Sequence, residues 1–186
     1  MTKLKKKRIL TITGLPGSGK TSAIEAIRDL GVIVTMGDVV RNEAKKRNLK
    51  LNGENLGRVA KELRVIRGQD IIAKKCVELI KNLEGDVIFV DGVRSLSEVN
   101  IFRKYWKFPI IAVVVNEEIR FQRLFERARS DDPKSLDELR ERDKRELEFG
   151  LDQVLEEADY RIVNNSTLED LKKKTRDLVL KIIKEY

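Results

Sequence analysis

Histidine is absent from this chain of 186 residues, and cysteine occurs once. Without histidine, Ser-His and Cys-His mechanisms are excluded, together with every metal site that uses a histidine ligand. A single cysteine also excludes a disulfide within the chain. Cys76 lies in an apolar stretch with helical spacing, so we expect a small buried hydrophobic residue there and not a nucleophile. Any catalysis must therefore use carboxylates, arginines, lysine and a bound metal ion.

Long hydrophobic runs are also missing. The basic residues 1–8 are followed by a short apolar run, which predicts neither a signal peptide nor a membrane-spanning helix. We therefore expect a cytoplasmic location. No internal repeat, low-complexity segment or linker is visible, and 186 residues suffice for one sizeable core. The sequence thus predicts a single α/β domain over residues 1–186.

Aromatic residues make up 5% of the chain, whereas charged residues make up 38% and leave a net charge of +8. This balance indicates a preference for polyanionic ligands, or a surface rich in ion pairs as in heat-adapted proteins. The basic run Lys3–Arg8 has no interleaved aromatic residues on which bases would stack, so a solvated tail is favoured there over a nucleic-acid site. Tyr105, Trp106 and Phe108 are expected to pack ahead of a strand and not to bind a base.

The most specific motif is a phosphate-binding loop of the pattern G-x-x-x-x-G-K-[ST]. Its residues are Gly14, Leu15, Pro16, Gly17, Ser18, Gly19, Lys20 and Thr21. The loop follows the apolar run 9–13 and precedes apolar residues at helical spacing, which is the order of strand, loop and helix that such a loop requires. Backbone N–H groups and the helix N-terminus are expected to surround the phosphates of ATP. Lys20 is expected to contact the β- and γ-phosphates, and Thr21 to bind Mg²⁺.

Apolar β-like runs alternate with helical sequence along the chain. We predict strands at Arg8–Thr13, Val32–Thr35, Val87–Asp91, Ile110–Val115 and Tyr160–Val163. This alternation predicts an α/β, three-layer P-loop NTPase fold, in which a five-stranded parallel sheet carries helices on both faces. Before the last helix, Ser166 and Glu169 form a capping-box pattern.

Two segments are too long to be simple connections: a helix-patterned insertion over residues 37–85 and an arginine-rich stretch over residues 120–149. Ligands of an open parallel sheet bind beyond the carboxyl ends of its strands, so both segments are expected to rise around the phosphate loop. Asp91 ends the third strand, where an aspartate of P-loop proteins helps to hold Mg²⁺. A turn or helix-capping role is the alternative for Asp91.

Signatures of the signalling GTPases are missing. Arg94 stands where the D-x-x-G motif that begins at Asp91 needs a glycine. The segment around Asn164 lacks the N-K-x-D sequence that recognises guanine. A GTPase switch is therefore disfavoured, and the loop must serve another nucleotide-dependent activity.

The sequence resembles the nucleoside monophosphate kinases, and adenylate kinase most of all. The segment Met36-Gly37-Asp38-Val39-Val40-Arg41 is similar to the G-D-x-x-R element that opens the acceptor-nucleotide region of those enzymes. Arg94, just beyond the third strand, corresponds in location to a second arginine on the acceptor phosphate. The resemblance thus implies acceptor-binding roles for Asp38, Arg41 and Arg94, and it makes residues 37–85 an acceptor-binding helical insertion.

A second part of the resemblance lies at residues 127–140. Arg127, Arg129 and Arg140 are similar to the lid arginines of adenylate kinases, including their spacing around Asp131 and Asp132. The resemblance implies that these arginines are catalytic and grip the transferring phosphoryl group, with the two aspartates orienting them. For the neighbouring arginines a solvated, salt-bridged helix exterior is the favoured interpretation. They are Arg120, Arg123, Arg142 and Arg145.

The match extends in element order through nearly the whole chain and is strongest with an archaeal family of adenylate kinase-related proteins. It implies an enzyme that uses Mg²⁺ and moves the γ-phosphoryl group of ATP to a small phosphorylated nucleotide, with AMP or another nucleoside monophosphate first. The physics agrees, because arginines and Lys20 stabilise the charge of a transferring phosphoryl group without a histidine base.

The acceptor and the class of activity have alternatives. The acceptor segment lacks the full set of adenylate kinase residues that select AMP, and Gly92-Val93-Arg94 replaces a longer turn of that enzyme. Asp38 and the Asn164-Asn165 segment also resemble dephospho-CoA kinases, which makes dephospho-CoA an alternative acceptor. A regulatory or nucleic-acid-associated protein that binds ATP without catalysis is the alternative from another class.

Overall fold

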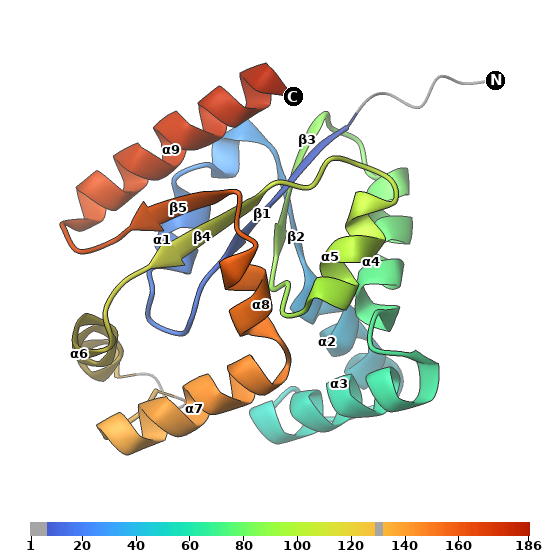
Figure 1. Cartoon of the computed structure of the whole chain (residues 1–186). Coiled ribbons are helices and arrows are strands. Elements are labelled where there is room, and N and C mark those ends of the chain that lie inside the picture. The colour runs from blue at the N-terminus through green and yellow to red at the C-terminus, as the bar shows by residue number, and fades with distance from the viewer. Residues whose placement is uncertain (1–6, 129–131) are drawn as a thin grey trace.

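A computed structural model describes residues 7–128 and 132–186 of the chain. Its centre is a five-stranded parallel sheet with the strand order β2-β3-β1-β4-β5 (Figure 1). The strands are β1 (Arg8–Thr13), β2 (Val32–Thr35), β3 (Val87–Asp91), β4 (Ile110–Val114) and β5 (Tyr160–Val163). The predicted parallel sheet is therefore confirmed, and the fourth strand ends one residue earlier than predicted.

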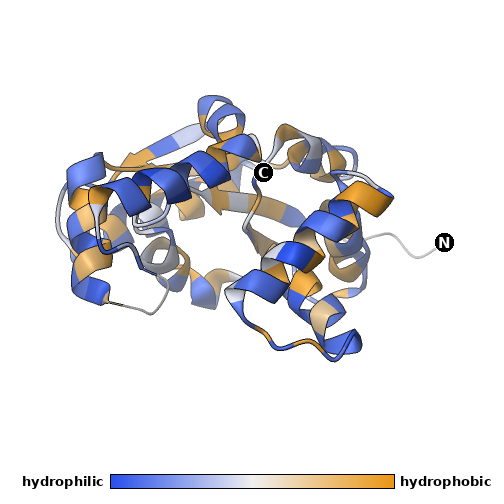
Figure 2. Ribbon diagram, turned by 90° about the horizontal axis from the view of Figure 1, so that it is seen from below, coloured by the Kyte–Doolittle hydropathy of each residue, from blue (hydrophilic) through white to orange (hydrophobic). Residues whose placement is uncertain are grey.

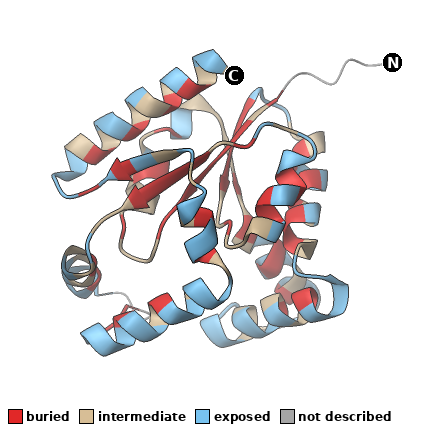
Figure 3. Ribbon diagram, in the orientation of Figure 1, coloured by how far each residue is buried: buried red, intermediate tan, exposed pale blue. Residues whose placement is uncertain are grey.

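Alternate residues of the central strands belong to two different hydrophobic clusters. In β1, Ile9 packs with the cluster of one face and Leu10 with that of the other. In β3, Ile88 and Phe89 alternate in the same way. Both faces of these strands are thus buried, which explains why they are apolar runs without an alternation of polar residues (Figure 3).

Helices cover the two faces of the sheet, so the three-layer P-loop fold is confirmed. The short α1 (Lys20–Glu25) and the long α9 (Leu168–Glu185) cover one face (Figure 1). The cluster of the other face includes residues of α4 (Ile71–Asn82), α5 (Leu96–Arg103) and α8 (Leu151–Glu156). Cys76 of α4 is fully buried in this cluster, as predicted.

Two helix boundaries differ from the sequence pattern. The helix after the phosphate loop is shorter than its apolar spacing suggests, because α1 ends at Glu25 and the 3₁₀ turn Arg28–Leu30 follows. At the last helix the capping residue is Thr167, whose side chain accepts a hydrogen bond from the Asp170 backbone N–H. The Ser166 hydroxyl instead contacts the Asp170 carboxylate, so the predicted cap at Ser166 was placed one residue too early.

Four helices lie beyond the carboxyl end of the sheet (Figure 1). They are α2 (Met36–Lys46), α3 (Gly53–Arg67), α6 (Glu117–Arg127) and α7 (Leu136–Glu148). Figure 2 views the molecule from this side, where hydrophilic residues predominate on α7. In Figure 1, α4 runs alongside the sheet, so the part of the insertion that lies beyond the carboxyl end of the sheet is α2 and α3.

Two of the three aromatic residues before β4, Trp106 and Phe108, pack as predicted. Phe108 is buried and stacks on Phe102 with ring centroids 4.5 Å apart. Trp106 packs against the same cluster, while Tyr105 lies half exposed on the surface. In the described part of the chain, no helix has the length and apolar character needed to cross a membrane.

Candidate functional site

The phosphate loop connects β1 to α1 at the carboxyl end of the sheet. Two of its glycines have backbone angles in the left-handed region, with φ of 79° at Gly17 and 99° at Gly19. A Cβ atom at position 19 would lie 2.3 Å from Nδ2 of Asn164. Glycine is required there for both conformation and space. The loop thus has a backbone shape that suits phosphate binding by N–H groups.

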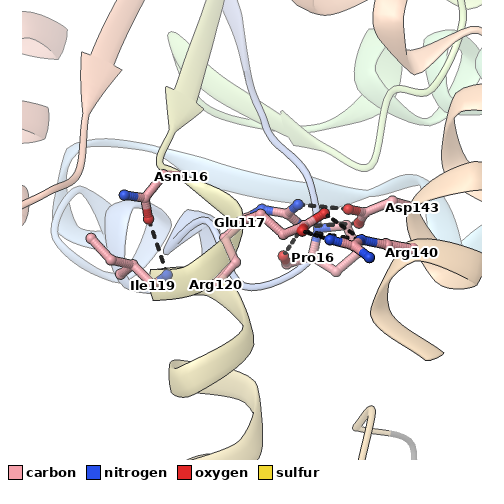
Figure 4. A network of polar contacts seen from close by, with 7 residues as sticks. All are labelled: Pro16, Asn116, Glu117, Ile119, Arg120, Arg140 and Asp143. Carbon is pink, nitrogen blue, oxygen red and sulfur yellow. Dashed lines mark hydrogen bonds and ion pairs between the residues drawn. The ribbon is translucent and has the colours of Figure 1, made fainter. Parts of the chain in front are cut away.

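Side chains from distant elements hold the outer side of this loop. Asn164, which follows β5 and is 3% exposed, donates from Nδ2 to the Ser18 carbonyl at 2.7 Å. Arg120 of α6 donates from Nη1 to the Pro16 carbonyl at 3.1 Å. Figure 4 shows the Arg120 guanidinium between Pro16 and Asp143, and Asp143 accepts from both terminal nitrogens at 2.9 and 2.6 Å.

The inner side of the loop forms the floor of a first cavity of about 400 Å³. The rest of its lining is rich in arginine and includes Arg94, Arg123, Arg127 and Arg142. Asp132 is buried and accepts from Nε of Arg127 at 2.8 Å, and Nη1 of Arg142 lies 3.7 Å from the same carboxylate. Asp132 therefore holds Arg127, one of the three predicted lid arginines, and lies near Arg142. This concentration of guanidinium groups suits a polyphosphate.

Lys20, Thr21 and Asp91 lie together at the start of α1 and the end of β3. The parallel register pairs Ile12 with Asp91, which sets this carboxylate beside the strand that leads into the loop. Nζ of Lys20 is 3.4 Å from Oδ1 of Asp91. This Oδ1 atom is buried and has no hydrogen-bond partner among the described residues. Thr21 and Asp91 also line the same cavity, which is separate from the first. Their hydroxyl and carboxylate groups are oxygen ligands of the kind that Mg²⁺ takes.

The Mg²⁺ donor set from the protein is small. Within residues 7–128 and 132–186, no group of three or more acidic or cysteine side chains is arranged to hold a metal ion. A Mg²⁺ ion on Thr21 and Asp91 would take its other ligands from water and from phosphate oxygens. Such a set is usual for Mg²⁺, which retains several waters and binds one or two carboxylates with substrate phosphates.

A second cavity of about 400 Å³ lies between α2, α3 and the end of β3. The residues that α2 and α3 contribute to its lining are apolar or small, apart from Arg41 and Arg64. They comprise Met36, Gly37, Val40, Gly53, Leu56, Gly57 and Ala60. Three residues, Lys20, Gly92 and Arg94, line both this cavity and the first. The two cavities therefore meet at a lysine and an arginine.

Each arginine of the second cavity has a carboxylate partner. Arg41 pairs with Asp38 in the first turn of α2, and Nε of Arg94 is 3.3 Å from Oε2 of Glu146 on α7. Arg64 pairs with the fully buried Glu98 at 3.1 Å.

The aromatic ring of Phe149 lies beside two of these arginines. The guanidinium carbon of Arg64 is 5.3 Å from the ring centroid, and that of Arg94 is 5.7 Å away. Both distances allow cation–π attraction. The second cavity is therefore basic, with its arginines held in place before a ligand enters.

The structure places most of the predicted site residues around these two cavities. The loop residues, Arg94 and Arg127 line the first cavity, and Arg41, Arg94 and Asp91 line the second. Asp38 does not line either cavity, but it forms an ion pair with Arg41, which lines the second, and its side chain is 60% exposed. Arg129 and Asp131 lie outside the described residues.

Arg140 lines neither cavity. It is a surface residue that pairs with Glu117 at 2.8 Å, and its side chain is 60% exposed. Hydrogen bonding from Arg140 lowers the pKa of Glu117 below its ordinary value.

Three arginines near the loop were assigned to a solvated helix exterior from the sequence. This prediction is wrong for Arg120, which is 4% exposed beneath the loop, although it is salt-bridged as expected. Arg123 and Arg142 line the first cavity. The spacing of Arg120, Arg123 and Arg127 by three and four residues places them along one side of α6, which is the signal that would have grouped them.

Comparison with known proteins agrees with this geometry. Residues 13–140 match the family model described as an AAA domain. The chain is 45% identical over 182 residues to a "UPF0200/UPF0201 protein" of Archaeoglobus fulgidus, covering 95% of this chain and 56% of that relative. The chain thus spans little more than half the length of that protein. It is 43% identical to a UPF0200 protein of Thermococcus onnurineus, covering 96% of this chain and all of the relative.

Solved structures with more distant sequences share the fold. TT1252 from Thermus thermophilus has a TM-score of 0.62 at 20% identity, covering 95% of this chain and 98% of that one. Shikimate kinase from Acinetobacter baumannii in complex with shikimate has a TM-score of 0.57 at 13% identity, covering 96% of each chain. At these identities the likeness shows a P-loop kinase fold and nothing more specific. This chain belongs to the AAA domain family and to the archaeal UPF0200 family.

Proposed function

We propose that this protein is an Mg²⁺-dependent kinase that transfers the γ-phosphoryl group of ATP to a small phosphorylated nucleotide, with AMP or another nucleoside monophosphate first. One observation carries the proposal: the cavity at the phosphate loop and the cavity between α2 and α3 share Lys20 and Arg94. A donor in the first and an acceptor in the second would present their phosphates to each other at that boundary. Positioning of this kind supplies much of the catalysis of phosphoryl transfer.

On the donor side, backbone N–H groups of the loop bind the phosphates of ATP. Lys20 contacts the β- and γ-phosphates, and Arg127 meets the charge that spreads over the transferring group. A Mg²⁺ ion on Thr21 and, through water, on Asp91 would neutralise the phosphate oxygens. Arg129 and Arg140 join Arg127 in this proposal. Arg140 would first exchange its exposed Glu117 partner for phosphate as the lid closes and excludes water.

On the acceptor side, Arg41 and Arg94 bind the phosphate of the incoming nucleotide. The small and apolar residues of α2 and α3 leave a slot of low polarity, which suits a planar base and sugar. An acceptor phosphate is already anionic at neutral pH and attacks without a general base. The absence of histidine is therefore no obstacle to this reaction.

A hydroxyl acceptor, such as that of dephospho-CoA, makes a different demand. The attacking hydroxyl benefits from a carboxylate base within hydrogen-bond reach. Asp38 is the residue that resembles this base, yet its side chain is 60% exposed and pairs with Arg41. Asp38 is also not among the residues that line the second cavity. This arrangement supports a phosphate acceptor over a hydroxyl acceptor.

The test measures Mg²⁺-dependent ADP release from ATP with and without AMP, CMP, UMP, GMP or dephospho-CoA. One acceptor is expected to stimulate release strongly, and Lys20→Ala is expected to reduce that rate by about 10²- to 10³-fold, because a charge-stabilising donor is lost. Lys174→Ala is the matched control, since Lys174 forms an ion pair with Asp170 on the far helix α9.

Two results would contradict the proposal. Turnover that persists in Lys20→Ala would exclude the mechanism. ATP binding without stimulation by any acceptor, together with oligonucleotide affinity that falls steeply with salt, would favour a regulatory or nucleic-acid-associated protein. The net charge of +8 is the observation that supports this alternative.

A further inference from the structure

Arg120 is a buried arginine that contacts the phosphate loop without lining the first cavity. Its Nη1 donates to the Pro16 carbonyl at 3.1 Å and to Asp143 Oδ1 at 2.9 Å, while Nη2 donates to Oδ2 at 2.6 Å (Figure 4). The remaining nitrogen, Nε, is buried and has no hydrogen-bond partner in the described part of the chain. The guanidinium is thus oriented entirely by the loop and by α7.

Stability alone is a poor explanation for this arrangement. Burial removes the hydration of both charges, and replacement of a buried ion pair by apolar side chains is often neutral or stabilising. The buried Nε adds a further cost, because its hydrogen bond to water is lost without replacement. What the pair does achieve is a fixed direction for one peptide group of the phosphate loop.

We propose that Arg120 is a positioning residue for ATP, and this inference rests on the proposed function of the loop as the ATP site. The Pro16 carbonyl and the Gly17 N–H belong to one trans peptide unit, so they point in opposite directions. By holding the carbonyl on the outer side, Arg120 aims the Gly17 N–H into the first cavity. Asn164 does the same for the Gly19 N–H by holding the Ser18 carbonyl.

The second partner of Arg120 extends this control to α7. Asp143 lies on the same helix as Arg142, which lines the first cavity, and as Glu146, which pairs with Arg94. Whatever fixes Asp143 also fixes where these two side chains enter the site. Through Arg120, the direction of the loop N–H group and the position of α7 are therefore coupled. The pair of Arg140 and Glu117 also joins α6 to α7.

A matched control exists elsewhere in the fold. Nη1 of Arg176 donates to the Ala26 carbonyl at 3.0 Å, and the guanidinium binds Asp29 through two bonds of 2.7 and 2.8 Å. This pattern of one carbonyl and one bidentate carboxylate repeats that of Arg120. It lies beyond the far end of α1, and both side chains are substantially exposed. Arg176→Lys thus loses the same bonds without touching the loop.

The experiment measures the Kd of Mg²⁺·ATP by calorimetry for the full chain and for Arg120→Lys, Asp143→Asn and Arg176→Lys. Arg120→Lys is expected to weaken ATP binding by about tenfold to hundredfold, because a hydrogen bond from a charged donor is lost and the N–H it aims is released. Asp143→Asn is expected to give a smaller loss in the same direction. Arg176→Lys is expected to bind ATP as the wild type does.

Amide hydrogen exchange separates positioning from general support of the fold. In the wild type, ATP is expected to protect the amides of both Gly17 and Gly19. In Arg120→Lys, protection of Gly17 is expected to fall while that of Gly19 persists, because Asn164 still holds the Ser18 carbonyl.

Several outcomes would overturn the inference. Unchanged ATP affinity in Arg120→Lys would do so, as would equal loss of protection at both glycines. If Arg120→Lys does not fold, Asp143→Asn decides in its place, and unchanged affinity there would count against the inference. If the wild type binds ATP tightly but no acceptor stimulates its ADP release, the kinase proposal is refuted. The role of Arg120 in ATP binding would still be supported by the affinities of the variants.

Discussion

The two cavities of the site are built in different ways. The first rests on the contiguous backbone 14–21, whose glycines and N–H groups form its floor. The second is lined by residues drawn from positions 20 to 94, on α1, β2, α2, α3, α4 and the end of β3. A site made of contiguous backbone leaves a short pattern in the sequence. A site made of dispersed side chains leaves no such pattern, and its ligand must be argued from shape and charge.

The electrostatics of the second cavity adds to this contrast. Arg41, Arg64 and Arg94 each have a carboxylate partner in the absence of ligand. An acceptor phosphate must therefore compete with a carboxylate for its arginine. Glu146 is the partner with most bearing on the reaction, because Arg94 lines both cavities. In the proposed function, this competition would lower acceptor affinity and favour ligands that also contact the apolar residues of α2 and α3.

The largest effect is expected from a change in the backbone-built cavity. In Gly19→Ala, the new Cβ meets Asn164 at 2.3 Å in a residue whose φ is 99°. Strain of this kind costs about 1–3 kcal/mol, so ATP affinity is expected to fall by about one to two orders of magnitude, as measured by calorimetry. Acceptor binding in the absence of ATP is expected to persist.

Gly85→Ala supplies the control for strain alone. Gly85 also has a positive φ, of 119°, but it precedes β3 at the opposite end of the sheet from the loop. This variant is expected to lose thermal stability and to keep its ATP affinity. If Gly19→Ala bound ATP normally, the first cavity would not depend on the backbone shape of the loop.

An intermediate effect is expected at the boundary of the two cavities. Arg94→Ala is expected to raise the KM of the acceptor by about tenfold, because a charged hydrogen bond to its phosphate is lost, with a smaller change in the KM of ATP. Glu146→Gln is expected to lower the KM of the acceptor, because Arg94 loses its competing anion. Steady-state kinetics with both substrates varied measures each effect.

Arg103→Ala is the control for loss of an exposed arginine, since Arg103 pairs with Glu157 on the surface and lines neither cavity. Its kinetics are expected to match those of the wild type. A larger effect of Arg94→Ala on ATP than on the acceptor would move Arg94 to the donor side and would break the division between the cavities.

The same contrast explains what was predictable from sequence. The strands at Val32–Thr35 and Val87–Asp91 were predicted at the residues where they occur, because short apolar runs between helical segments have few other structures available. The phosphate loop was predictable because its glycines meet a backbone requirement. In both cases a local pattern determines a local structure.

Burial and pairing were harder to predict because they depend on residues far apart in the chain. The sequence around Arg120 has the composition of a surface helix. Arg120 is held at its buried position by hydrogen bonds to Asp143 and to the Pro16 carbonyl, which lie far away in the chain. The small residues of α3 match no motif, although they leave the space of the second cavity. The cap at Thr167 in place of Ser166 is a shift of one residue that local sequence does not decide.

The smallest effect is expected beneath the second cavity. Cys76 lies on α4, the helix that also contributes Ile72 to the cavity wall. Burial, with a smaller contribution from the charges of Glu98 and Asp38, raises the pKa of the Cys76 thiol to about 12. The physical cause is the burial of Cys76 in the apolar cluster that covers this face of the sheet.

The raised pKa makes stability depend on alkaline pH. In the window between pH 9.0 and about 12, the unfolded chain loses the Cys76 proton while the folded chain retains it. The folded state then binds more protons, so the free energy of unfolding must fall as pH rises through this window. Relative to Cys76→Ala, the wild type is expected to lose about 1 kcal/mol between pH 8 and pH 10, measured by urea unfolding. Lysines and tyrosines titrate in both proteins and cancel in the difference.

A stability difference between the two proteins that does not change with pH would mean that water reaches Cys76. The layer beneath the second cavity would then be hydrated, and the cavity would be less suited to a nucleotide base.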